Sequence, residues 1–276
     1  GLTVTDNNEV EIITSGGRKL EALVNDLIAA KHHIHFEYFY FLKDDGSRRI
    51  KNLLMQKARE GVKVRFIHEN IANITIWPGY YNEMKEAGVE IVKFTNPNSF
   101  LLSKFNYRDH RKIVVIDGKV GYTGGMNIGE DYFFRWRDTH MRLTGNAVAA
   151  LQYCFMNSWI TSGGKIDGGF EEFFPQDRVT HDDKLIQIIP DEPDREFPIL
   201  HMGALWTAHH AERYLYIQTP YFVPPEPLLL ALKSAVFRGC DVRLMVPEKA
   251  DLFFMGPANK SFYQDCLEAG IRIYEK

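Results

Sequence analysis

Cysteine is scarce in this sequence, and several familiar motifs are missing from it. The three cysteines (Cys154, Cys240 and Cys266) are odd in number, widely separated and form no Cys-x-x-Cys pair. A disulfide or metal framework is therefore not expected, and a reducing compartment is favoured. No apolar run approaches the ~20 residues of a membrane-spanning helix. Neither His-Glu-x-x-His nor Gly-x4-Gly-Lys-Ser/Thr occurs, so we expect no metal centre and no nucleotide-driven phosphoryl transfer.

Charge of one sign is also not in large excess. The net charge of −3 gives little long-range attraction to a polyanion, so nucleic acid is not an expected partner, although one local basic site remains compatible with it. Of the 276 residues, 45% are hydrophobic and 25% are charged, a composition that is typical of a globular protein. The length suits one large domain or two ordinary ones.

Strand-like and helix-like segments alternate along the chain. Alternating or β-rich patterns predict strands over 9–14, 32–41, 62–67 and 89–94. Helical spacing of apolar residues predicts helices over 18–31, 47–60 and 79–87. This order indicates an α/β architecture with a mainly parallel sheet flanked by helices.

An internal repeat divides the sequence. Residues 32–41 (HHIHFEYFYF) align with 213–222 (RYLYIQTPYF), an offset of 213 − 32 = 181. Two more pairs match in the same order at offsets of 178 and 182, namely 59–69 with 237–247 and 80–94 with 262–276. A shared helix-stop motif would explain one match but not three. We therefore predict a duplicated βαβαβαβ unit and two lobes, 1–180 and 181–276.

The segment 106–140, NYRDHRKIVVIDGKVGYTGGMNIGEDYFFRWRDTH, is the richest in chemically useful side chains. It predicts a strand over 110–117, a hairpin turn at Asp117-Gly118 and a second strand over 119–123. Alternation places His110 and Lys112 on one face, and a titratable nucleophile beside a fixed cation suits phosphate chemistry. Asp117 lies an odd number of residues from His110 and is better interpreted as a turn and scaffold group.

Further along, Gly124-Gly125 allows close approach of the backbone to a ligand, and Asn127 can donate amide N–H groups to a phosphate oxygen. Singly, such residues are more often structural than catalytic. Together they satisfy the spacing H-x-K-x4-D-x6-G-G-x-N, which resembles the signature of the phospholipase D superfamily. The flanking words WRDTHMRLTG and IQTPYFVPPEPLLLAL resemble bacterial cardiolipin synthases, and the resemblance covers about residues 8–276.

The resemblance implies a two-lobed phospholipase D-like fold, with mixed, mainly parallel sheets flanked by helices and a truncated second lobe. It implies four catalytic residues: His110, Lys112, Asp117 and Asp138. His110 is the nucleophile at phosphorus or its acid–base counterpart, and Asp138 is the carboxylate that orients the motif histidine. Phosphate is implied to bind to Lys112, Asn127 and Gly125. The family chemistry needs no cofactor and no metal.

The implied reaction joins two phosphatidylglycerol molecules into cardiolipin through a phosphatidyl-histidine intermediate. Phosphodiester hydrolysis by the same motif and a catalytically inactive membrane scaffold are the alternatives. The transferase and the hydrolase differ in the acceptor of the phosphatidyl group, which is an alcohol for the transferase and water for the hydrolase. With the offset of 182, a second motif histidine would fall near 110 + 182 = 292, beyond the last residue. We therefore predict half a catalytic site, inactive alone, which self-association or a missing C-terminal portion would complete.

Residues outside the motif also carry predictions. Glu37 is expected to pair with a cation near the site, and His32-His33 and His209-His210 are expected to be structural. A membrane surface, on the cytoplasmic side of a bacterial cell membrane, is an expected partner, since apolar residues in three loops suit a bilayer interface. These are Phe100, Leu101, Leu102 and Phe105; Trp77, Tyr80 and Tyr81; and Leu252, Phe253, Phe254 and Met255. The alternative is that these loops pack against their own domain.

Overall fold

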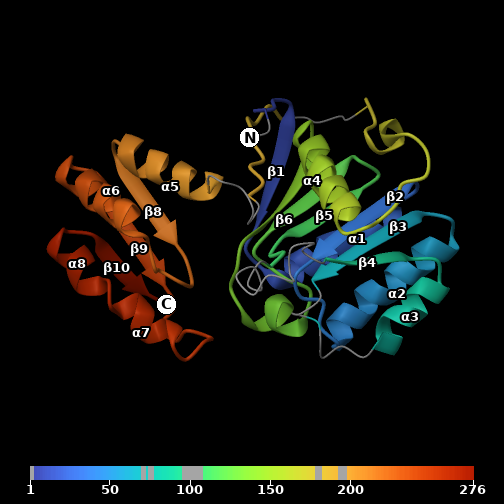
Figure 1. Cartoon of the computed structure of the whole chain (residues 1–276), viewed down its shortest axis with the longest axis horizontal. Coiled ribbons are helices and arrows are strands. Elements are labelled where there is room, and N and C mark those ends of the chain that lie inside the picture. The colour runs from blue at the N-terminus through green and yellow to red at the C-terminus, as the bar shows by residue number, and fades with distance from the viewer. Residues whose placement is uncertain (1–2, 70–72, 74–77, 95–107, 178–181, 192–197) are drawn as a thin grey trace. The chain divides into compact units, whose positions relative to one another are not determined.

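The computed structural model describes residues 3–69, 73, 78–94, 108–177, 182–191 and 198–276. The chain divides into two compact units, Gly1–Pro190 and Asp191–Lys276 (Figure 1). This division falls ten residues after the predicted lobe boundary (190 − 180). The reason is that Thr5 and Ile186 exchange backbone hydrogen bonds of 2.8 and 2.9 Å, which hold the segment around Ile186 on the first unit.

The first unit contains every strand and helix predicted up to residue 123, with ends shifted by at most three residues. In chain order its elements are β1 (Asn8–Ile13), α1 (Gly16–Ala29), β2 (His33–Tyr38), α2 (Asp45–Arg59), β3 (Lys63–Glu69), α3 (Pro78–Glu86), β4 (Glu90–Phe94), β5 (Lys112–Ile116), β6 (Val120–Gly124), β7 (His140–Gly145) and α4 (Ala147–Thr161). A π-helical turn at Asp131–Arg135 and a 3-10 turn at Phe170–Phe173 complete it.

Seven strands form one sheet in the order β1-β7-β6-β5-β2-β3-β4. The pairs β2–β3 and β3–β4 are parallel, as βαβ connections require, whereas the other four pairs are antiparallel. The antiparallel half begins at the predicted hairpin, where Asp117 and Gly118 have φ of 53° and 64°, the conformation of a type I′ turn. The mixed α/β class is confirmed, and the sheet combines a parallel half with an antiparallel half.

Helices cover both faces of this sheet (Figure 1). On one face α1, α2 and α3 enclose a core with alternate residues of β2, including Leu23, Leu54, Met84, Ile34 and Phe36. On the other face α4 packs its aromatic side chains against β5, including Phe155, Trp159, Ile113 and Val115. Lys112 at the start of β5 therefore lies on a strand that is buried on both sides, whereas His110, two residues before β5, is exposed.

One membrane prediction is wrong. Tyr80 and Tyr81 are each 7% exposed, because α3 turns them into the first core instead of toward solvent. Tyr81 stacks on His68 at a centroid distance of 4.3 Å, and Lys51 Nζ lies 3.9 Å from the Tyr80 ring centroid. Trp77 and the apolar residues of 100–105 lie outside the described residues. In the part of the chain that the structure describes, no helix is both long and apolar enough to cross a bilayer.

The second unit repeats the order found from α1 to β4. It consists of α5 (Ile199–His210), β8 (Tyr214–Gln218), α6 (Glu226–Phe237), β9 (Asp241–Val246), α7 (Met255–Lys260), α8 (Tyr263–Glu268) and β10 (Arg272–Glu275). Its three strands are parallel in the order β10-β9-β8. The core lies on one face of this sheet, while the other face exposes Tyr214 and Tyr216.

A buried asparagine makes the same contact in both units. Asn73 Oδ1 accepts the N–H of Phe41 at 3.1 Å, and Asn259 Oδ1 accepts the N–H of Phe222 at 2.7 Å. Their amide groups donate to the carbonyls of Phe39 and Pro220, two residues earlier in each copy. Phe41 and Phe222 are separated by 222 − 41 = 181 residues, the offset of the sequence repeat. The shared contact supports the duplication.

Candidate active site

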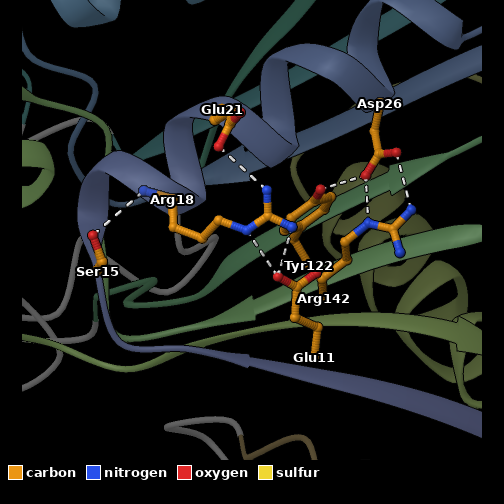
Figure 2. A network of polar contacts seen from close by, with 7 residues as sticks. All are labelled: Glu11, Ser15, Arg18, Glu21, Asp26, Tyr122 and Arg142. Carbon is orange, nitrogen blue, oxygen red and sulfur yellow. Dashed lines mark hydrogen bonds and ion pairs between the residues drawn. The ribbon is translucent and has the colours of Figure 1, made fainter.

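A polar network holds α1 against the antiparallel half of the sheet (Figure 2). Arg142 of β7 donates to both carboxylate oxygens of Asp26 at 2.7 and 3.0 Å, and the Tyr122 hydroxyl donates to the same carboxylate. These hydrogen bonds raise the pKa of Arg142 above its ordinary value. At the start of α1, Ser15 Oγ accepts the N–H of Arg18. The helix is thereby fixed in register with β6 and β7.

His110 and Lys112 meet at the ring of Phe39. The His110 and Phe39 ring centroids are 4.6 Å apart, and Lys112 Nζ lies 5.2 Å from the Phe39 centroid. Lys112 Nζ also donates to the backbone carbonyl of His110 at 2.6 Å. The structure therefore brings together the two residues that strand alternation places on one face.

The environment sets the charge of both side chains. Partial desolvation, together with the charge of Lys112, lowers the pKa of His110 to about 4, although this side chain stays exposed to solvent. Burial lowers the pKa of Lys112 to about 8, although the carboxylates of Asp109 and Asp138 act to raise it. At neutral pH the site thus presents a neutral imidazole, which has a free lone pair, beside an ammonium group that is largely charged.

Asn127 is buried, and its Oδ1 accepts the N–H of Tyr40 at 3.1 Å. Because the carbonyl end of the carboxamide is engaged, its Nδ2 group is the end that can donate to an anion. The predicted donor role of Asn127 is therefore compatible with its orientation.

The two glycines make room for protein atoms. A Cβ at Gly125 would lie 2.3 Å from Asp138 Oδ1, and one at Gly124 would lie 2.6 Å from the Cα of His140. The N–H of Gly125 donates to the Thr139 carbonyl at 2.9 Å. The close approach at these glycines is made by residues 138–140, which lead into β7, and the Gly125 N–H is hydrogen-bonded to the backbone. Phosphate binding at Gly125 stays a prediction.

Asp138 does not contact the motif histidine. Its Oδ1 accepts the N–H of Thr139 at 2.6 Å, and within the described residues it forms no hydrogen bond with His110. Its charge instead acts on two lysines, raising the pKa of Lys112 and that of Lys19 against the effect of burial. An orienting role of Asp138 at His110 therefore stays a prediction.

Asp117 has the geometry of a scaffold group. Its Oδ1 accepts the N–H groups of His32 and His33 at 2.8 and 2.9 Å, and its Oδ2 accepts that of Lys31 at 2.9 Å. These bonds join the β5–β6 hairpin to the residues that lead into β2. Asp117 follows the end of β5 opposite Lys112, so it lies apart from the His110–Lys112 group.

Glu37 lies under α4 and does not form the expected ion pair within the described residues. Burial and the neighbouring Asp109 carboxylate raise the pKa of Glu37 well above its ordinary value. Beside it, the Arg111 guanidinium donates to Ser158 Oγ at 2.9 Å. Asp109 and Arg111 flank His110 in the chain, so this buried cluster supports the histidine from the opposite face of the sheet.

The paired histidines are structural where the structure shows their contacts. Gln152 of α4 bridges His33 and His35 with hydrogen bonds of 3.1 and 2.7 Å, and both imidazoles are buried. At the end of α5, His210 stacks on Trp206 and shares a 2.8 Å hydrogen bond with its carbonyl.

Comparison with known proteins identifies the family. Residues 23–159 and 206–276 match the family described as cardiolipin synthase, PLD-like domain. This chain belongs to that family. The cardiolipin synthase of Alkalihalophilus pseudofirmus is 36% identical over 279 residues, which cover 99% of this chain and 56% of that protein. The major cardiolipin synthase ClsA of Bacillus subtilis is 36% identical over 282 residues, covering 98% and 58%.

The chain thus spans little more than half the length of these curated family members. Among solved structures, the phosphatidylserine synthase of Haemophilus influenzae Rd KW20 superposes with a TM-score of 0.66 over 97% of this chain and 73% of that one. The two sequences are 14% identical, so this likeness concerns the fold. The phospholipase D-like fold that the sequence resemblance implies is confirmed.

Proposed function

We propose that this chain supplies the His110 half of a phosphatidyl transfer site. The supporting observation is the neutral imidazole of His110 next to the buried ammonium of Lys112, both at the ring of Phe39. A neutral imidazole can attack phosphorus, whereas an imidazolium cannot. A buried cation beside it stabilises the negative charge on the phosphoryl oxygens in the transition state.

In the proposed reaction a ring nitrogen of His110 forms a bond to the phosphorus of phosphatidylglycerol, and the bond from phosphorus to glycerol breaks. The glycerol oxygen takes up a proton as it leaves. A hydroxyl group of a second phosphatidylglycerol then attacks the phosphatidyl-histidine, loses its proton, and releases the free imidazole together with cardiolipin. Phosphodiester is exchanged for phosphodiester, so no nucleotide is consumed.

Three neighbouring residues support these steps. Lys112 Nζ and Asn127 Nδ2 donate to the non-bridging oxygens. Asp138 keeps Lys112 charged, since its carboxylate counteracts the effect of burial on the lysine pKa. We assign the proton on the leaving glycerol to a second motif histidine, provided by another copy or by a longer polypeptide, because H-x-K-x4-D occurs once in this sequence.

The test uses labelled phosphatidylglycerol in vesicles. The chain is assayed alone and mixed with a polypeptide carrying a second motif, and the products are separated into cardiolipin and phosphatidic acid. We expect cardiolipin from the mixture, a loss of more than 100-fold with His110→Ala, and a change of less than twofold with the control His209→Ala, which alters an exposed histidine on α5. Phosphatidic acid as the main product would assign hydrolysis instead.

We also propose that residues 252–254 contact the bilayer. Leu252, Phe253 and Phe254 are 42%, 90% and 54% exposed, next to α7. The loop is anchored beside them, since the Tyr221 hydroxyl donates to the Asp251 carboxylate. Exposed aromatic side chains on an anchored loop suit insertion at the lipid headgroup level.

Co-sedimentation with phosphatidylglycerol vesicles tests this contact. Phe253→Ser should weaken binding at least about tenfold, because a Phe side chain that enters the apolar boundary gains roughly 1.5–3 kcal/mol. The matched control is Phe237→Ser at the end of α6, where the side chain is 77% exposed. Equal binding by both variants and the unaltered chain would refute the contact.

A further inference from the structure

Lys19 is a fully buried lysine on α1, with 0% of its surface exposed. Its Nζ donates to two consecutive backbone carbonyls, that of Met126 at 2.8 Å and that of Asn127 at 3.1 Å. The same Nζ lies 4.8 Å from the ring centroid of Tyr38 on β2. Lys19 thus reaches across 108 residues of sequence to the loop that carries the amide donor of the site.

Burying an amine in a protein core is unfavourable unless its donors are satisfied. Desolvation lowers the pKa of Lys19 well below its ordinary value, and the charge of Asp138 opposes that shift. Within the described residues Lys19 forms no ion pair at salt-bridge distance, so its hydrogen bonds go to the loop carbonyls. A methionine or leucine would fill the same space without this cost, which indicates a role for the donors themselves.

The loop is held on its other side by residues 40–42. The N–H of Ile128 donates to the Tyr40 carbonyl at 3.3 Å, and the N–H of Leu42 donates to the Ile128 carbonyl at 3.0 Å. The carboxamide oxygen of Asn127 accepts the N–H of Tyr40. Lys19 and the 40–42 segment therefore fix the backbone of Asn127 between them, and the backbone determines where the Nδ2 group can lie.

We propose that Lys19 is a positioning residue for Asn127, whose Nδ2 group is to bind the substrate phosphate. The inference rests on the proposed function in assigning phosphate to Asn127. Lys19 acts through the two carbonyls and does not touch the substrate. Its removal should free the Met126–Ile128 loop, and the Asn127 Nδ2 group should then lose its fixed position.

Three variants separate positioning from simple stabilisation. Lys19→Met keeps the length and apolar stem but removes the donors, and Lys19→Gln restores a donor without the charge. Lys57→Met is the matched control, because Lys57 is also buried and donates to a backbone carbonyl, that of Ala30 at 3.1 Å, on a different part of the unit.

The first readout is hydrogen exchange at the amides of Tyr40 and Ile128 in this chain. These two N–H groups bond to Asn127 Oδ1 and to the Tyr40 carbonyl, so they report directly on the loop. After correction for global stability, we expect exchange at least tenfold faster in Lys19→Met, a smaller increase in Lys19→Gln, and no change in Lys57→Met. Equal exchange in Lys19→Met and Lys57→Met would overturn the proposal.

The second readout is the affinity for inorganic vanadate, a phosphate-like anion, measured by calorimetry. Lys19→Met should bind about tenfold more weakly than the unaltered chain, and Lys57→Met should bind equally well. Absence of vanadate binding to the unaltered chain would count against the proposed phosphate site, while the exchange data would still decide whether Lys19 holds the loop. Unchanged affinity in Lys19→Met, with wild-type binding intact, would also overturn the proposal.

Discussion

Replacing Asp117 tests whether this motif residue is a scaffold or a chemical group. In Asp117→Ala three backbone N–H groups lose a charged acceptor, those of Lys31, His32 and His33. At partly exposed positions each such loss costs about 1 kcal/mol. Residue 117 also has φ of 53°, and an alanine in the left-handed region costs about 1 kcal/mol more. We therefore expect the first unit to lose about 4 kcal/mol of unfolding free energy.

Two further variants divide this sum. Asp117→Gly removes the acceptor but adopts positive φ freely, so it should lose about 3 kcal/mol. Asp117→Asn keeps one oxygen and tolerates the left-handed region, so its loss should be about 2 kcal/mol. If Asp117 contributes three hydrogen bonds and also adopts a left-handed backbone conformation, the loss of unfolding free energy should increase in the order Asn, Gly, Ala.

Urea unfolding followed by tryptophan fluorescence measures these losses. A Trp206→Phe background removes the indole of the second unit, and the buried Trp159 then reports on the first. A loss below about 1 kcal/mol in Asp117→Ala would refute the scaffold reasoning, since the three lost hydrogen bonds together are expected to cost about 3 kcal/mol. In the mixed assay, Asp117→Asn should keep most of its transfer activity when folded, because Asp117 does not contact the His110–Lys112 group.

Three other outcomes follow from the same geometry. Burial lowers the pKa values of His33, His35, His68 and His140 in the folded state. Because the unfolded chain then binds more protons below pH 6.5, the melting temperature should fall as the pH is lowered from 6.5 toward 4. A melting temperature that calorimetry finds independent of pH over this range would contradict the lowered pKa values. Gly125→Ala should displace Asp138, whose Oδ1 would be 2.3 Å from the new Cβ, and so lower the pKa of Lys112 further, which NMR titration of Lys112 Nζ can detect. Arg142→Met should lower the free energy of unfolding in urea by about 2–3 kcal/mol, because Asp26 loses a bidentate partner. A change within about 0.5 kcal/mol, the range of ordinary surface substitutions, would show that the network in Figure 2 contributes little to stability.

Local patterns were sufficient for much of the fold. Strands and helices can be predicted from the sequence because their hydrophobic periodicities of two and 3.6 residues appear within a short segment of the chain. The hairpin at Asp117-Gly118 was predictable for the same reason, as was the shared position of His110 and Lys112. The repeat was visible because two copies of one unit keep similar buried positions, and the same fold constraint explains the recurrent contact of Asn73 and Asn259.

Other parts of the site depended on contacts between distant segments. Lys19 sits in an amphipathic helix whose pattern gives no sign that one lysine points inward, and its partners are 107 and 108 residues away. The raised pKa of Glu37 arises only when β2, the Asp109 segment and α4 meet. Asp138 matches a family position, yet its carboxylate faces Lys112 and Lys19 and forms no bond with His110 among the described residues.

The sequence by itself determined the family and the repeated unit, and it singled out the residues that we propose carry chemistry, because these depend on residue type and local spacing. Only the tertiary structure decided which side chains lose water, which charges face one another, and which backbone groups hold Asn127 and Asp117 in place. Burial and electrostatic interaction depend on distance through space, and that distance is fixed when separate segments pack into one core.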